Sequence, residues 1–172
     1  MLNIHAIKKD TLYNVMLQQL YSLNYMWFRF DDFIRVQAPE AYGNEEYYQL
    51  QEGYGLQEAG RLVKALGFLG EEIKDLVKFL KYSHWAIFEN IEIAELTANS
   101  FRMRTLDCSA QKAAKRRGTE YYDCRIEGMR IRSGFFKGIN RKAKVQRIFT
   151  PPEARPKDTH ANVSCEWLIS LD

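Results

Sequence analysis

The spacing of apolar residues changes near residue 90, and this change most constrains the fold. Before it, apolar residues recur every three or four positions, as in "LYNVMLQQLYSLNYMWFRFDDF", the period of an amphipathic helix. After it, apolar and polar residues alternate in short runs such as "FRMRTLD", "AKVQRIFT" and "VSCEWLISL", as in β-strands. A helical half, 1–90, and a mixed half, 91–172, predict the α+β class, with N-terminal helices packed on a C-terminal antiparallel sheet of about four strands.

The helical half carries recognisable stop and start signals. Pro39 ends the first helix, because proline cannot continue a helix, and Asn44 caps the second. Three glycines, Gly53, Gly55 and Gly60, fall inside this second helix, where each costs about 1 kcal/mol relative to alanine. We therefore expect either a kink or a close contact with another helix there, and four or five helices in all.

The mixed half predicts a hairpin and a buried last strand. "IEIAELTA" and "FRMRTLD" are joined by an expected turn at Asn99-Ser100. In the last strand every second residue shares one face, which we predict to be the core side and which contains Val163, Cys165, Trp167, Ile169 and Leu171. Glu166 lies on the opposite face, where it must be paired if helices cover it.

The length of 172 residues predicts a single domain, 1–172, large enough for its own core. The first residues do not have the pattern of a secretory signal. No window contains the roughly 18 uninterrupted apolar residues that a membrane span needs, so no membrane partner is predicted. Three cysteines are an odd number, which favours free thiols in a reducing compartment over a disulfide framework. The expected location is the cytoplasm.

The positive charge is concentrated in residues 101–147, which contain 14 Lys and Arg against 4 Asp and Glu. Such a segment suggests either an interaction face for an acidic partner or a solvated face that pairs with the acidic half of the chain. Its basic run "KAAKRRG" lacks interleaved aromatic residues, so nucleic acid is not the predicted partner. The sequence contains no P-loop and no G-x-G-x-x-G motif.

The three cysteines are the main candidates for chemistry, and three interpretations remain open. With His160 as a fourth ligand, Cys108, Cys124 and Cys165 make up a Cys3His set of the kind that holds zinc or iron. Cys108 directly precedes a short predicted helix, whose N-terminus lowers the pKa of a thiol and favours a nucleophile. Free cysteines are also common as small buried core residues.

The aromatic residues offer a ligand pocket as a further candidate. The chain has 10 Tyr, 10 Phe and 3 Trp, and Tyr122 and Trp167 are the pocket walls nearest to the cysteines in sequence. Such residues line cavities between helices and a sheet, or they simply fill an aromatic core.

The order of these motifs resembles a known family. The segments "GLQEAGRLVKALG", "LDCSAQKAAKRRG", "YYDCRIEGMRIRSGFFKGIN", "AKVQRIFTPPEARPKD" and "SCEWLISL" together look like a family of bacterial and archaeal cytosolic proteins of unknown function. That family is similar in turn to L-2-amino-thiazoline-4-carboxylic acid hydrolase-like proteins, and the last strand resembles the end of the 4-vinyl reductase domain. The resemblance implies an α+β fold with a small-molecule pocket, and a homodimer.

Three functions follow as hypotheses. The first is binding of a small ligand or a metal in a pocket bordered by Cys108, Cys124 and Cys165. The second, implied by the resemblance, is hydrolysis of a cyclic C–N bond of the thiazoline or amidine kind. In that case Cys108 is the nucleophile or a metal ligand, and Glu166 or His160 transfers the proton. The third is an interaction protein that uses the basic face of residues 101–147.

Overall fold

The computed structural model describes residues 8–171. The chain divides into two compact units, Met1–Tyr42 and Gly43–Asp172, and each is described by itself. The first unit contains the 29-residue helix α1 (Lys9–Gln37). This helix ends two residues before Pro39, as the sequence predicts. The expectation of a single domain stays a prediction.

The second unit contains the other helices and all the strands of the described residues. In chain order these are α2 (Glu45–Leu66), α3 (Ile73–Leu80), α4 (His84–Phe88), β1 (Asn90–Ala94), β2 (Ser100–Asp107), α5 (Ser109–Arg116), α6 (Glu127–Ile139), β3 (Ala143–Phe149) and β4 (Cys165–Leu171). The predicted α+β class is confirmed. Residues 8–171 hold six helices, one more than the upper end of the expected four or five, and the short helix predicted after Cys108 is confirmed as α5.

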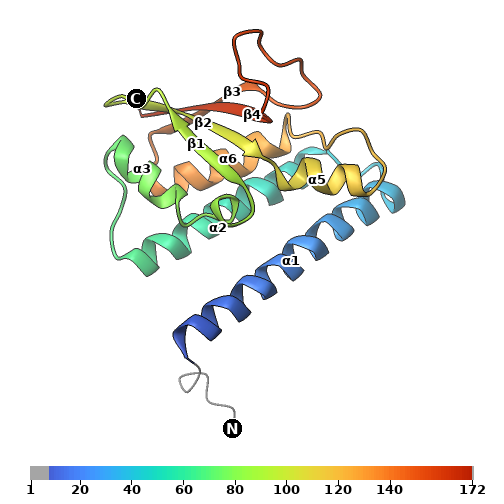
Figure 1. The fold of residues 1–172 in the computed structure, drawn as a ribbon, viewed down its shortest axis with the longest axis horizontal. Helices are drawn as coiled ribbons and strands as arrows, with labels where there is room; N and C mark the ends of the chain where they lie inside the picture. The colour runs from blue at the N-terminus through green and yellow to red at the C-terminus, as the bar shows by residue number, and fades with distance from the viewer. Residues whose placement is uncertain (1–7, 172) are drawn as a thin grey trace. The chain divides into compact units, whose positions relative to one another are not determined.

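The four strands form one antiparallel sheet in the order β1-β2-β4-β3. The last strand in the sequence is therefore central and pairs on both sides. Trp167 lies opposite Met103 on one side and Arg147 on the other, while Cys165 lies opposite Thr105. In Figure 1, α6 runs beneath this sheet and α2 runs alongside α6.

The hairpin between β1 and β2 is confirmed, but its turn is longer than expected. Strand β1 ends at Ala94, and the next residue, Glu95, has a positive φ of 51°, a conformation that interrupts an extended strand. The Thr97 hydroxyl oxygen then accepts hydrogen bonds from the backbone N–H groups of Asn99 and Ser100. A five-residue connection, 95–99, thus replaces a tight turn at Asn99-Ser100.

Helices α2 and α6 pack closely and run in the same direction. A Cβ atom at Gly55 would lie 2.7 Å from the Phe135 backbone nitrogen and closer still to the Ile131 oxygen. One at Gly134 would overlap the Glu52 oxygen of α2. The expected close contact is therefore confirmed at Gly55. In contrast, Gly53 and Gly60 have no atom within 4 Å of a Cβ position.

The core lies between the sheet and the helices. The predicted inner face of the last strand is confirmed, since Trp167 and Ile169 are fully buried and Val163 and Cys165 nearly so. Cys165, Trp167 and Ile169 share the core with Phe101 and Met103 of β2, Phe135 and Phe136 of α6, and the apolar face of α3. Within residues 8–171, no helix is both long enough and apolar enough to cross a membrane.

Candidate functional site

The three cysteines come from three different parts of the second unit and meet in space. Cys108 is the N-cap residue of α5, Cys124 precedes α6, and Cys165 begins β4. The three thiols lie near one another, since Cys165 contributes to the raised pKa of Cys108, and both Cys108 and Cys165 contribute to that of Cys124. The juxtaposition follows from the sheet, because β2 and β4 are adjacent and Thr105 pairs with Cys165 three residues before Cys108.

Both Cys108 and Cys124 are poor nucleophiles in this state. Burial raises the pKa of the Cys108 thiol well above its ordinary value, and the nearby Glu89 carboxylate and Cys165 add to the shift. Burial also raises the pKa of Cys124, and the neighbouring Cys108 and Cys165 raise it by smaller amounts. The dipole at the start of α5 does not overcome these effects. The two thiols are therefore neutral around pH 7, whereas catalysis needs a thiolate.

A buried arginine stands beside the thiols. Arg132 of α6 is 6% exposed, and its guanidinium carbon lies 4.9 Å from the centre of the Trp85 ring and 4.6 Å from that of Trp167. The Trp167 indole nitrogen in turn donates to the Cys165 sulfur over 3.2 Å. Arg132 also favours the thiolate forms of Cys108 and Cys124, though burial outweighs this effect.

Arg132 forms no ion pair with any residue of the described chain. Its Nη1 donates to the backbone oxygen of Gly128 over 3.1 Å, and its Nε has no hydrogen-bond partner there. Buried guanidinium groups normally bind a carboxylate or phosphate, since burying a charge is costly. This arginine is therefore the most distinctive polar group of the core.

Two further polar atoms around the thiols are buried without a hydrogen-bond partner in the described chain. One is Oε2 of Glu89, whose Oε1 accepts from the Ser109 hydroxyl over 3.1 Å and from the Cys108 thiol over 3.6 Å. The other is the hydroxyl of Thr105, opposite Cys165 in the sheet. Because Glu89, Ser109 and Cys124 are only half-buried, the cluster reaches the protein surface beside them.

The segment before α6 is held against α5 by hydrogen bonds. The Gln111 side chain accepts from the backbone N–H of Tyr122 and donates to its oxygen. The Tyr122 hydroxyl donates to buried Glu127 over 2.6 Å, and the Tyr47 hydroxyl donates to the same carboxylate oxygen over 3.2 Å. Tyr122 thus anchors Glu127, and its hydroxyl is engaged within the fold.

His160, the fourth ligand of the predicted metal set, lies in a loop and contacts a residue two positions along the chain. It is exposed in the loop between β3 and β4, and its Nδ1 lies 2.6 Å from Oδ1 of Asn162. No group of three or more His, Cys, Asp or Glu side chains within residues 8–171 could hold a metal ion. The predicted Cys3His set for zinc or iron therefore has no support in the geometry.

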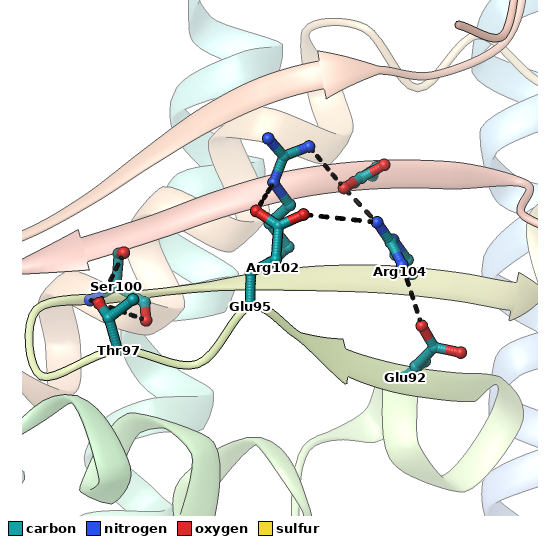
Figure 2. Close-up of polar contacts among 7 residues, drawn as sticks. Glu92, Glu95, Thr97, Ser100, Arg102 and Arg104 are labelled. Carbon is teal, nitrogen blue, oxygen red and sulfur yellow. Dashed lines mark hydrogen bonds and ion pairs between the residues drawn. The ribbon is translucent and has the colours of Figure 1, made fainter. Parts of the chain in front are cut away.

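Glu166 is paired on the face of the sheet opposite the core. It is 1% exposed, and its Oε1 lies 2.9 Å from Nη1 of Arg102 and 3.3 Å from Nε of Arg104. Figure 2 shows how Glu95 and Glu92 continue this network, with Glu95 reaching both arginines. The sequence condition that Glu166 be paired if it is covered is met, because both Arg102 and Arg104 lie within ion-pair distance of its carboxylate.

Many cations of the basic segment pair with carboxylates of the same chain. Besides the two sheet arginines, Arg130 binds Glu45 and Glu52, and Lys137 also binds Glu52. These pairs join α6 to the acidic α2. Other members of such pairs are Lys112, Arg125 and Arg147. The geometry therefore favours a solvated, internally paired face for much of residues 101–147.

Arg132 and Glu89 were not among the predicted site residues. A signal for Arg132 was present in the sequence: it falls on the same helical stripe as Gly128, Phe135 and Ile139, the buried side of α6. A charged residue on an apolar stripe is unusual. Glu89 offered no such signal, because only the tertiary structure brings it to Cys108.

The second unit is thus a small α+β protein with a buried polar cluster where its sheet, α4, α5 and α6 meet. The chain belongs to a family of unknown function, DUF6125, whose model matches residues 16–171. No curated protein and no solved structure matches the chain. The resemblance to thiazoline carboxylate hydrolase-like proteins and to the 4-vinyl reductase domain has no support in these comparisons.

Proposed function

We propose that the chain is a small-ligand-binding protein whose ligand carries a carboxylate that binds Arg132. We define the Arg132 site by Arg132, the two indoles of Trp85 and Trp167, and the thiols of Cys108, Cys124 and Cys165. The observation that carries the proposal is the buried guanidinium without an ion partner in the described chain.

The energetics of burial support an anionic ligand. Removing a charged group from water costs several kcal/mol per ion unless a partner offsets it. Contacts with two aromatic rings return about 1 to 2 kcal/mol each, and one backbone acceptor returns about as much. A bound carboxylate would supply the missing ion partner of Arg132, because its two oxygens can accept two parallel hydrogen bonds from a guanidinium group.

The surrounding groups suggest the rest of the ligand. Around Arg132 the site is mostly apolar and polarizable, since it consists of the two indoles and the neutral thiols of Cys108 and Cys124. Oε2 of Glu89 accepts hydrogen bonds, and the hydroxyl of Thr105 accepts or donates them. We therefore infer a compact carboxylate that also carries an N–H or O–H group. The hydrolase alternative is less favoured, since Cys108 is protonated and Glu166 lies on the other face of the sheet.

Paired small carboxylates and amides test this proposal on the full chain. Acetate and benzoate are compared with acetamide and benzamide, which have nearly the same shape without the charge, by measuring the thermal unfolding midpoint. At ten times its dissociation constant a bound ligand adds about 1.4 kcal/mol of stability, a rise of roughly 3 to 6 °C for a chain of this size. We expect a carboxylate, but not its amide, to raise the midpoint.

Two arginine variants assign the effect to the site. Arg132→Met should abolish the carboxylate response, whereas Arg130→Met, on the same helix but bound to Glu45 and Glu52 at the surface, should keep it. Equal responses to a carboxylate and its amide, or a response that survives in Arg132→Met, would contradict the proposal.

A further inference from the structure

Helix α1 exposes many large apolar side chains. Seven of them lie on one side of the helix and are between 47% and 63% exposed: Val15, Met16, Leu23, Met26, Phe30, Phe33 and Val36. The first compact unit contains only this helix among its described residues. A single helix cannot form a core, and its stability comes from packing its apolar face against something else.

Six apolar residues and two glutamines of α1 follow a strict alternation of four and three residues. Eight positions make up this series, which we name the α1 seam: Leu12, Met16, Gln19, Leu23, Met26, Phe30, Phe33 and Gln37. This alternation repeats every seven residues, or 3.5 residues per position within each repeat, which is the a/d pattern of a coiled coil. The repeat spans nearly all of α1.

We propose that the α1 seam packs against the α1 seam of a second copy of this chain, so that the protein is a homodimer. A seam with a 3.5-residue period fits a helix with the same period, because the side chains of each insert between those of the other. A second copy necessarily carries this repeat. A two-fold interface is also self-complementary by symmetry.

The area of the seam is sufficient for a stable dimer. A half-exposed side chain of this size leaves on the order of 100 Å² in water, so the five exposed apolar residues of the seam and the neighbouring Val15 and Val36 together contribute about 700 Å² per copy, close to the roughly 800 Å² of a standard interface. The flanking e and g positions hold a single charge, Arg29, and are otherwise Tyr13, Val15, Leu20, Ser22, Trp27, Ile34 and Val36. They offer no charge pattern that would select a different partner.

The two polar seam positions favour a parallel, in-register arrangement. In that arrangement Gln19 meets Gln19 of the second copy and Gln37 meets Gln37, so the amides bond to each other. Antiparallel pairing about the middle of the seam would instead place Gln19 against Phe30 and Gln37 against Leu12. Buried amides without hydrogen-bond partners are unfavourable.

Sedimentation equilibrium on the full chain tests the proposal, over about 1 to 100 µM, the range in which micromolar dissociation is visible. Phe30→Glu introduces a charge into the seam. Tyr25→Glu is the control, since Tyr25 is a 68% exposed aromatic residue of α1 outside the seam. We expect the unchanged protein and Tyr25→Glu to be dimers, and Phe30→Glu to dissociate at least about 100-fold more readily, because two buried rings are lost and two charges are brought together.

A monomer throughout this range would overturn the proposal, as would equal weakening by the two variants. A monomer in which Phe30→Glu lowers the thermal midpoint would show that the seam is covered by its own chain, and would also overturn it. Gln19→Cys tests the direction: oxidation with diamide should join the two copies through this position in the parallel dimer. A dimer that stays unlinked would refute the parallel arrangement.

Discussion

The close contact between α2 and α6 predicts opposite effects for the same substitution at two glycines of one helix. Gly55 and Gly60 are five residues apart in α2. Glycine to alanine in a helix interior normally stabilises by about 1 kcal/mol. That gain should appear in full at Gly60, where a Cβ meets nothing within 4 Å.

At Gly55 the same methyl group collides with the backbone of α6. Its Cβ would lie 2.7 Å from the Phe135 nitrogen and nearer to the Ile131 oxygen, and backbone atoms cannot rotate away as a side chain can. The two helices would have to separate, and overpacking of this kind costs roughly 1 to 3 kcal/mol or more. We expect Gly55→Ala to lie about 2 to 4 kcal/mol below Gly60→Ala in free energy of unfolding.

Urea denaturation followed by circular dichroism measures both variants on the same scale. A difference of 2 to 4 kcal/mol corresponds to roughly 4 to 16 °C between their thermal midpoints for a chain of this size. Gly134→Ala provides a second approach to the same contact from α6 and should behave like Gly55→Ala. Equal stability of Gly55→Ala and Gly60→Ala would refute the reasoning, because it would mean that α2 and α6 do not touch at this point.

Two further predictions concern the thiols and Glu166. The raised pKa values of Cys108 and Cys124 mean that the native state holds these protons more tightly than the unfolded state. Stability should be fully present below about pH 8.5 and fall above it, by about 4 kcal/mol at pH 10 for the two thiols. Urea denaturation with reductant at pH 8 and pH 10 measures this fall, and an unchanged fall in the Cys108→Ala, Cys124→Ala double variant would contradict it. Glu166→Gln should lose about 2 kcal/mol, because it weakens the charge-assisted hydrogen bond from Arg102 and removes the ion pair with Arg104. Glu92→Gln at the exposed end of the network should lose less than about 0.5 kcal/mol, and similar losses in the two variants would count against this account.

The sequence predicts some features of the proposed ligand site and misses others. It placed Cys108 at the start of a helix and Cys165 on the core face of the last strand, and both positions are confirmed. It did not foresee that burial would keep Cys108 and Cys124 neutral, since a pKa depends on every group packed around the thiol. His160 stood close to Cys165 in the sequence, yet it bonds to Asn162 in an exposed loop. The Cys3His set therefore stays a prediction.

Local patterns in the sequence determined the class of the fold, because helical and strand periods are properties of neighbouring residues. Pro39 ended one helix, Asn44 capped the next, and alternation set the buried face of the last strand. Only the tertiary structure decided which segments meet. The central position of β4, the contact of Gly55 with α6 and the placement of Arg132 between Trp85 and Trp167 depend on residues far apart in the chain. No local pattern encodes such contacts, because they arise from the simultaneous packing of all the elements.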